Sequence, residues 1–358
     1  MRIVNLYSPA LSANLIVYGV SHAVIDGVCA AVIFSVLKEQ LLNEADFASI
    51  VLLYCFLGFG LQAVFGLATD YFKAPRMAAL SGCVLTGLSA LIFLSYPEPA
   101  IVLAGLGNAL FHVGGGSISL NLTPEKAAAP GIFVAPGALG LLVGTLIGKS
   151  GLFIIWPAIL ILAILCVLMF AVEKPEMNYD RKEIRSDTLA CFESIFLLLF
   201  LSIGIRSFVG SVLVFPWKSS LNLLFVLTLA VVLGKALGGI LADKYGWINV
   251  AAGALALSIP FLVFGANFPA TAILGMFLFN ITMPVTLVGI SNILPGQPGF
   301  AFGLPCFALL LGALPGFFPI RKLFADDLII FIVILASTLS LYAGLRLYSK
   351  GLVIEESK

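Results

Sequence analysis

Long apolar runs, separated by short polar or turn-forming stretches, follow one another along the whole chain. A helix needs about 20 apolar residues to cross a bilayer, and these runs reach or approach that length. Twelve of them fall near residues 10–37, 46–69, 76–96, 98–121, 127–148, 151–172, 189–214, 219–241, 247–265, 269–292, 299–320 and 327–347. The pattern predicts an all-α integral membrane protein with twelve transmembrane helices. Pro284 and Pro305 fall inside two of the runs, where proline is expected to kink a helix.

The chain divides into two similar halves. Its longest polar stretch, from Glu173 to Asp187, has six apolar runs on either side. We therefore predict an N-terminal six-helix bundle over 1–172, a cytoplasmic linker over 173–188 and a C-terminal six-helix bundle over 189–358. Parallel halves related about the membrane normal are a known plan of secondary transporters.

A short pattern repeats at equivalent places in the two halves. A glycine precedes an aspartate by four residues, as Gly66 with Asp70 and as Gly239 with Asp243, and Lys244 follows the second copy. Glycine allows helices to approach closely, and aspartate can cap the N-terminus of a neighbouring helix. We expect these five residues to form a conformational gate at the cytoplasmic ends of the helices.

Composition narrows the class of protein. The 358 residues are 61% hydrophobic and only 10% charged, whereas soluble domains carry about 25% charged residues. Most of the surface must therefore face lipid. A net charge of +1 without a basic stripe argues against a nucleic-acid partner. The sequence has no Walker loop, HExxH, CxxC or GxSxG, so we predict neither an enzyme nor a bound cofactor.

The distribution of Lys and Arg predicts the orientation in the membrane, because cytoplasmic loops carry an excess of positive charge. Twelve of these residues lie on one side: Arg2, Lys73, Arg76, Lys126, Lys174, Arg181, Lys182, Arg185, Lys244, Arg346, Lys350 and Lys358. Five lie on the other: Lys38, Lys149, Lys218, Arg321 and Lys322. We expect a multi-pass inner-membrane protein with both termini in the cytoplasm.

His22 and Asp26 lie in the middle of the first apolar run. A carboxylate at mid-depth costs about 2.5–3.5 kcal/mol on insertion scales, so it is expected to face the protein interior or a water-filled path. The two residues are four positions apart and share one face of a helix. A carboxyl and an imidazole placed in this way can bind and release protons near neutral pH. We predict that Asp26 and His22 couple transport to protons.

The repeated loop pattern resembles the signature of the major facilitator superfamily, roughly G-x-x-x-D-(R/K)-x-G-(R/K). Gly239, Asp243, Lys244 and Gly246 match this signature, whereas in the first copy Tyr71 and Lys73 stand where a basic residue and the second glycine are expected. The resemblance implies two pseudo-symmetric bundles that expose a central site alternately to each side of the membrane.

Within that superfamily the chain resembles the fosmidomycin-resistance-type exporters. Four stretches carry this resemblance: Ser21-His22 with Asp26, Gly105 to His112, Phe133 to Gly137 with Gly140 and Gly144, and Leu294-Pro295-Gly296 with Gly299 and Gly303. The resemblance implies export of an amphipathic or anionic compound by exchange. Thr145 stands where antiporters usually carry proline, and Val113 and Gly114 follow His112 in place of proline and an acidic residue. Because of these departures, uptake of the solute stays an alternative to its export.

The resemblance also implies that the first, fourth, seventh and tenth helices line a central cavity, with the substrate near mid-membrane. Counting along the helices at 1.5 Å per residue places Asp26, His112, Arg206 and Asn280 near that depth. The fixed charge and five donors of Arg206 suit a carboxylate or phosphonate. We predict that Arg206, His112 and Asn280 bind substrate, with Phe111 and Phe34 beside its apolar part.

The leading hypothesis is a proton-coupled secondary transporter of a small amphipathic or anionic organic compound, acting as a monomer in the bilayer and exporting by exchange. Two alternatives from the same class stay open. One is an uptake symporter of an organic solute, and the other is a transition-metal transporter with His22, Asp26 and His112 as ligands. A membrane-embedded enzyme or sensor is the alternative from another class.

Overall fold

The computed structural model describes residues 9–39, 44–180, 186–318, 324 and 326–356, and all the regular elements in these ranges are helices. Ten helical segments there are long and apolar enough to cross a membrane. Two shorter apolar helices, Ile155–Ala171 and Ile248–Val263, bring the set to twelve. This confirms the predicted fold class of an all-α, multi-spanning membrane protein.

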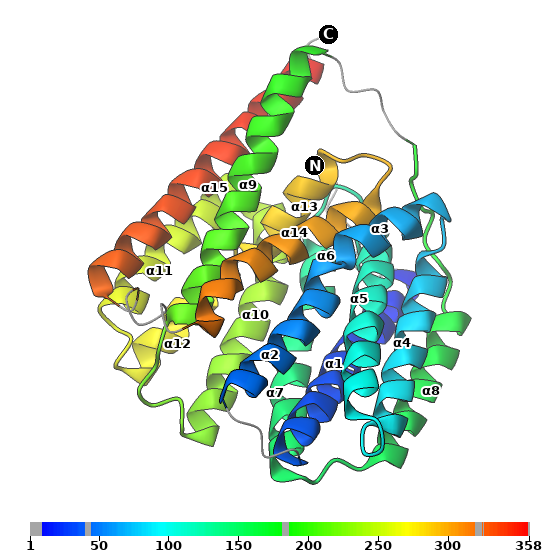
Figure 1. The fold of residues 1–358 in the computed structure, drawn as a ribbon. Helices are drawn as coiled ribbons and strands as arrows, with labels where there is room; N and C mark the ends of the chain where they lie inside the picture. The colour runs from blue at the N-terminus through cyan, green and yellow to red at the C-terminus, as the bar shows by residue number, and fades with distance from the viewer. Residues whose placement is uncertain (1–8, 40–43, 181–185, 319–323, 325, 357–358) are drawn as a thin grey trace. The chain divides into compact units, whose positions relative to one another are not determined.

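The elements follow the predicted runs in order (Figure 1). The first half contains α1 (Pro9–Glu39), α2 (Glu44–Cys55), η1 (Phe56–Gly60), α3 (Gln62–Tyr71), α4 (Pro75–Ile92), α5 (Pro97–Leu122), α6 (Ala128–Val134), α7 (Gly137–Ser150) and α8 (Ile155–Ala171). The second half contains α9 (Ser186–Val212), α10 (Leu221–Tyr245), η2 (Ile248–Ala252), α11 (Gly253–Val263), α12 (Pro269–Asn280), α13 (Met283–Asn292), α14 (Pro298–Ala313), η3 (Leu314–Phe317) and α15 (Asp327–Glu356).

Several predicted runs are interrupted helices. The second run contains the π-helical turn η1 between α2 and α3. The fifth is broken before Gly137, and the tenth is broken ahead of Pro284, which occupies the first turn of α13. Proline cannot donate the hydrogen bond that would continue the preceding helix, so the predicted irregularity at Pro284 is confirmed. Pro305 lies inside α14 without ending it.

The chain folds into two compact units. The first takes in residues of Met1–Pro124, Ile132–Asn178 and Pro298–Phe307. Within it, α1 packs on α5 and α7, and α4 packs between α5 and α8 (Figure 1). A Cβ on Gly140 would overlap the backbone of Ala23, and one on Gly144 would overlap that of Gly27. These glycines let α7 lie directly against α1, as small residues do in membrane helix pairs.

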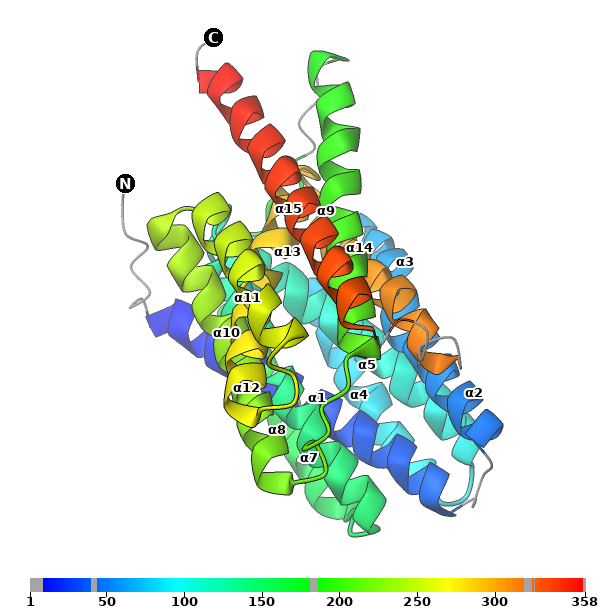
Figure 2. The ribbon, with the colours of Figure 1, turned by 90° about the vertical axis from the view of Figure 1, so that its left-hand side faces the viewer.

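The second unit takes in residues of Glu125–Gly131, Tyr179–Gln297 and Ala308–Lys358. Its helix α9 runs beside α15, and α12 packs on both α10 and α11 (Figure 2). The hydroxyl of Ser202 on α9 lies 3.0 Å from that of Ser337 on α15, so a buried polar contact joins this pair. Each unit thus includes a short segment from the other half of the chain.

The predicted boundaries at 172 and 188 stay a prediction, and residues 181–185 of the linker lie outside the described residues. The predicted orientation also stays a prediction. Seven of the residues on which it rests lie outside the described residues: Arg2, Arg181, Lys182, Arg185, Arg321, Lys322 and Lys358.

Candidate ion-coupling, substrate and gate sites

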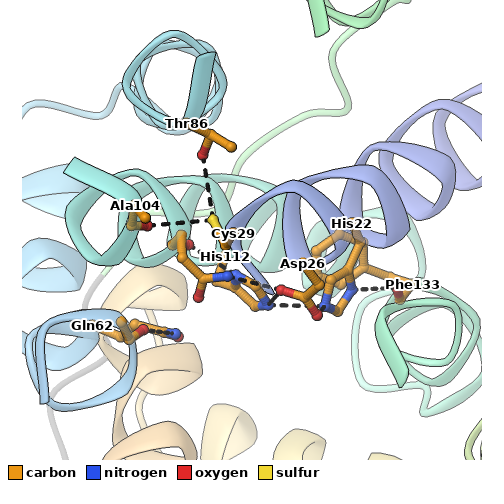
Figure 3. A network of polar contacts seen from close by, with 10 residues as sticks. His22, Asp26, Cys29, Gln62, Thr86, Ala104, His112 and Phe133 are labelled. Carbon is orange, nitrogen blue, oxygen red and sulfur yellow. Dashed lines mark hydrogen bonds and ion pairs between the residues drawn. The ribbon is translucent and has the colours of Figure 1, made fainter. Parts of the chain in front are cut away.

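The middle of α1 presents His22 and Asp26 on one face, one helical turn apart (Figure 3). His22 Nε2 lies 3.2 Å from Asp26 Oδ2. The side chain of His22 is 6% exposed and that of Asp26 is 18% exposed. The helical spacing therefore places the two side chains together as predicted, and the fold buries most of the surface of both.

Two residues of α5 complete the cluster. His112 Nε2 lies 2.8 Å from His22 Nε2 and 3.6 Å from Asp26 Oδ1. One turn earlier, the Asn108 amide donates a 2.8 Å hydrogen bond to Asp26 Oδ1. Packing of α5 on α1 thus brings both histidines of the chain to a single carboxylate. We call His22, Asp26, Asn108 and His112 the His–Asp cluster.

Backbone carbonyls fix both imidazole rings. His22 Nδ1 lies 2.8 Å from the carbonyl oxygen of Phe133, and His112 Nδ1 lies 2.8 Å from that of Asn108. A carbonyl oxygen only accepts hydrogen bonds, so each Nδ1 carries the hydrogen. In the neutral form each ring then directs the lone pair of Nε2 toward the other ring. Two lone pairs at 2.8 Å repel each other unless a cation lies between them.

Two aromatic side chains lie close to the imidazole rings. The centroid of the fully buried Phe111 ring lies 6.3 Å from His22 and 5.9 Å from His112, and that of Phe133 lies 4.9 Å from His22. The cluster also meets Gly137, where a Cβ would overlap His22 Nε2 and Asp26 Oδ2. The start of α7 therefore leaves room for the cluster only because residue 137 has no side chain.

Arg206 lies in the second unit and is buried. Its guanidinium donates to the hydroxyls of Thr282 and Thr286, the latter at 2.8 Å. Among the described residues of that unit, no carboxylate lies within the 4.0 Å of an ion pair to Arg206. The two threonines are neutral, so they do not offset the positive charge of the guanidinium.

Of the remaining predicted substrate residues, Phe34 lies in the first unit and Asn280 in the second. Phe34 is two turns along α1 from Asp26, and Lys149 Nζ lies 5.0 Å from the centroid of its ring. Asn280 ends α12, and its amide donates to the Met276 carbonyl of the same helix at 2.8 Å. The structure brings His22, Asp26, His112 and Phe111 together, but it does not bring Phe34 into that group. Asn280 and Arg206 belong to the other unit.

The two repeated aspartates occupy matching positions. Asp70 accepts hydrogen bonds from the backbone amides of Gly299 and Phe300 at the start of α14, both at 2.8 Å. Asp243 accepts from those of Ala127 and Ala128 at the start of α6, both at 2.9 Å. These are the capping contacts predicted for the aspartates.

The glycines of the pattern explain how the helices approach. A Cβ on Gly66 would overlap the backbone of Gly299, and a Cβ on Gly239 would overlap that of Ala127. Lys244 is exposed, and its Nζ lies 4.9 Å from the ring centroid of Tyr245.

The sequence prediction missed Asn108, Gly137, Thr282 and Thr286. Asn108 precedes His112 by four residues in an otherwise apolar helix, which was a usable signal of a shared polar face. Thr282 and Thr286 have the same spacing. The role of Gly137 depends on how α7 meets α1, and no local pattern shows that.

No family model and no curated protein matches the sequence, but solved structures match the fold. A crystal structure of FucP, a major facilitator superfamily transporter, in the outward conformation matches with a TM-score of 0.64 at 12% identity, over 93% of this chain and 99% of FucP. A structure of the E. coli fucose:proton symporter FucP matches with a TM-score of 0.62 at 13% identity, over 92% and 99%. The human organic anion transporter MFSD10 matches with a TM-score of 0.69 at 12% identity, over 92% and 99%.

Identities of this size show the fold alone. This chain has the fold of major facilitator superfamily transporters, as the loop pattern and the twelve apolar runs predicted. The narrower resemblance to the fosmidomycin-resistance-type exporters stays a prediction.

Proposed function

We propose that this chain is a proton-coupled secondary active transporter that exports a small amphipathic or anionic organic compound by alternating access. The main support for this proposal is the His–Asp cluster. In it, two imidazoles and a carboxylate converge inside a chain with the fold of transporters. Polar and ionisable residues inside membrane segments are costly and usually belong to ion or proton pathways.

The geometry of the cluster supports a proton as the coupling ion. Because both Nδ1 atoms are held by carbonyls, one proton between His22 Nε2 and His112 Nε2 turns a repulsive contact into a hydrogen bond of 2.8 Å. The protonated pair carries one positive charge, which the neighbouring Asp26 carboxylate balances. The cluster can therefore hold a proton while remaining electrically neutral overall.

Arg206 supports an anionic solute. A buried guanidinium whose neighbours are hydroxyl groups has a charge that an organic anion can neutralise. Its planar set of donors suits a carboxylate or phosphonate better than a lysine would. The likeness of the fold to an organic anion transporter and to a proton symporter is consistent with these two features.

The capping contacts of Asp70 and Asp243 support a gate role for the repeated pattern. Each carboxylate lies at the positive end of a helix dipole and bonds two amides that would otherwise lack partners. We propose that Asp70 and Asp243, together with Gly66, Gly239 and Lys244, stabilise one state of the transport cycle and release these helix ends in the other.

The test begins with a thermal-shift screen of the purified chain against organic anions, since a ligand raises the stability of the native state according to its concentration and affinity. Hits are then added to proteoliposomes that contain the pH-sensitive dye pyranine. We expect solute movement to change the internal pH in the wild type and in Gly19→Ala. Proton movement should be lost in Asp26→Asn. Unaltered coupling in Asp26→Asn would refute the role of the cluster.

Gly19→Ala is a suitable control because its new Cβ would lie 3.7 Å from Pro136 Cγ, an ordinary packing distance, one turn before His22 on the same helix. Counterflow in oriented vesicles separates export from uptake. Solute and protons move in opposite directions in an exporter of this kind, and in the same direction in an uptake symporter.

A further inference from the structure

We propose that His22 Nε2, His112 Nε2 and the Asp26 carboxylate form a binding site for one divalent transition-metal ion. The inference rests on the same cluster as the proposed function, but it concerns equilibrium binding and not transport. It follows from four features of the cluster: the spacing of the ligand atoms, the hydrogen bonds that orient them, the close packing of Gly137 against them and the chemistry of the three groups.

The ligand atoms have the spacing of a metal site. Zinc bonds imidazole nitrogen and carboxylate oxygen at about 2.0–2.2 Å, so two ligands of one tetrahedral ion are about 3.4 Å apart. The distances in the cluster are 2.8 Å between the two Nε2 atoms, 3.2 Å from His22 to Asp26 and 3.6 Å from His112 to Asp26. One atom from each of the three residues lies within 4.8 Å of the others. A single ion can therefore bond all three groups with small side-chain movements.

A further hydrogen bond, made by an atom other than the proposed ligand nitrogen in each histidine and by the carboxylate in Asp26, holds each of the three groups in place. Metal-binding histidines almost always donate their other ring N–H to a carbonyl or carboxylate, which fixes the tautomer and aims the free nitrogen. Both histidines do so here, to the carbonyls of Phe133 and Asn108. The carboxylate in turn accepts from the Asn108 amide. Three ligands prepared in this way need little reorganisation when an ion arrives.

The backbone of Gly137 packs directly against two of the ligand atoms. A Cβ at this position would overlap both His22 Nε2 and Asp26 Oδ2, so a side chain there would push these two atoms out of the positions in which they can share an ion. A divalent ion on one carboxylate also retains a net positive charge, which favours a water or an anionic group as its next ligand.

The donor set indicates the class of metal. Two imidazoles with one carboxylate suit cobalt, nickel, zinc or ferrous iron, whereas magnesium and calcium prefer all-oxygen sites. Thiolate is not part of the set, because Cys29, the nearest cysteine along α1, directs its Sγ to the Ala104 carbonyl at 3.4 Å.

The experiment uses purified chain, with any affinity tag removed and bound metal stripped by a chelator. The chain contains only two histidines, so every protein imidazole that ligates metal comes from the cluster. Cobalt(II) is titrated and followed by its visible absorption, and zinc binding is measured by calorimetry. We expect one ion per chain, with affinity at least tenfold lower in His22→Gln, in His112→Gln and in Asp26→Asn.

The matched pair of glycine variants tests the packing of Gly137 against the ligand atoms. Gly137→Ala should weaken binding at least tenfold, while Gly19→Ala should bind as the wild type does. Should the histidine variants fail to fold, pulsed electron paramagnetic resonance of copper(II) on the wild-type chain decides the question, since two imidazole nitrogens must couple to the ion. Binding that survives the histidine substitutions, a cobalt spectrum dominated by thiolate charge transfer, or an absence of saturable binding would overturn the proposal.

The same preparations separate this inference from the proposed function. Proton-coupled flux is measured in the presence of chelator. Proton-coupled flux in a chain that binds no metal would refute only the metal site. Metal binding in a chain that shows no proton-coupled flux of any organic solute would refute only the proposed function.

Discussion

Asp70 Oδ1 accepts a 2.8 Å hydrogen bond from the backbone amide of Gly299, a residue 229 positions later in the chain. Oδ2 of the same carboxylate bonds the next amide, that of Phe300, and Asp243 repeats the arrangement with Ala127 and Ala128. The two halves thus share one kind of contact, in which an aspartate at the end of one helix caps the start of another. The fold uses it twice, once in each unit.

Asp70→Asn should destabilise the protein measurably. An asparagine side chain has one acceptor oxygen, so one of the two helix-start amides loses its partner and the other loses a charge-assisted bond. Hydrogen bonds to charged groups contribute about 1.5–3 kcal/mol each, and we expect a loss of about 2 kcal/mol in the free energy of unfolding. Thermal denaturation in detergent measures it, with Asp243→Asn as the equivalent change in the other unit.

Glu193→Gln is the control for this experiment, because Glu193 is exposed on α9 and its substitution should change stability by less than about 0.5 kcal/mol. Equal melting temperatures for Asp70→Asn, Asp243→Asn and the wild type would show that the caps do not stabilise this state.

Replacing either glycine of the repeated pattern by alanine should separate helices that now touch. The Cβ of Gly66→Ala would meet the backbone of Gly299, and that of Gly239→Ala would meet the backbone of Ala127. Backbone cannot rotate away as a side chain can, so we expect each variant to lose about 1–3 kcal/mol. Gly253→Ala is the control, because outside the adjoining residues and the nearby backbone of its own helix no heavy atom lies within 4 Å of the new Cβ. It should be neutral or stabilise α11 by up to about 1 kcal/mol. A similar loss in all three variants would show that the close contacts of Gly66 and Gly239 are not its cause.

The sequence predicted what depends on position along a helix. The length of each apolar run predicted the twelve helices, and the repeated pattern predicted the two capping aspartates. The spacing of four residues predicted that His22 and Asp26 share a helix face. Even the break before Pro284 could be predicted, since it follows from the missing N–H of proline.

The rotation of each helix about its axis and the contacts between helices could not be predicted in the same way. Counting residues gave the depth of His112 and of Asn280 but not the direction in which each side chain points. The structure places His112 Nε2 against His22 through the packing of α5 on α1, and the substrate-binding role of His112 stays a prediction. The contact of Gly137 with the cluster likewise depends on the approach of α7 to α1, so only the folded chain reveals it.

Asn108→Ala should lower proton-coupled flux while leaving the binding of solute unchanged. The Asn108 amide holds Asp26 Oδ1 at 2.8 Å and so positions the carboxylate against both imidazoles. Losing a hydrogen bond to a charged group costs about 1.5–3 kcal/mol, and each 1.36 kcal/mol is tenfold in rate. We expect maximal flux to fall at least tenfold with an unaltered half-saturation concentration. A rise in half-saturation without a fall in maximal flux would place Asn108 in the substrate site instead.

Arg206→Lys should weaken the binding of anionic solutes although it keeps the positive charge. The guanidinium reaches Thr282 and Thr286 at once through two separate nitrogens, and a single ammonium on a flexible stem cannot reproduce that planar set of donors. We expect the half-saturation concentration for an anion found in the thermal-shift screen to rise at least tenfold, with little change for a neutral analogue.

Thr286→Val should produce a smaller shift in the same direction, because it removes one of the two hydroxyls that orient the arginine. The control is Thr228→Val, whose hydroxyl bonds only the Leu224 carbonyl of its own helix α10. If Arg206→Lys transports the anion as the wild type does, the guanidinium is a packing element of the second unit and the anion binds elsewhere.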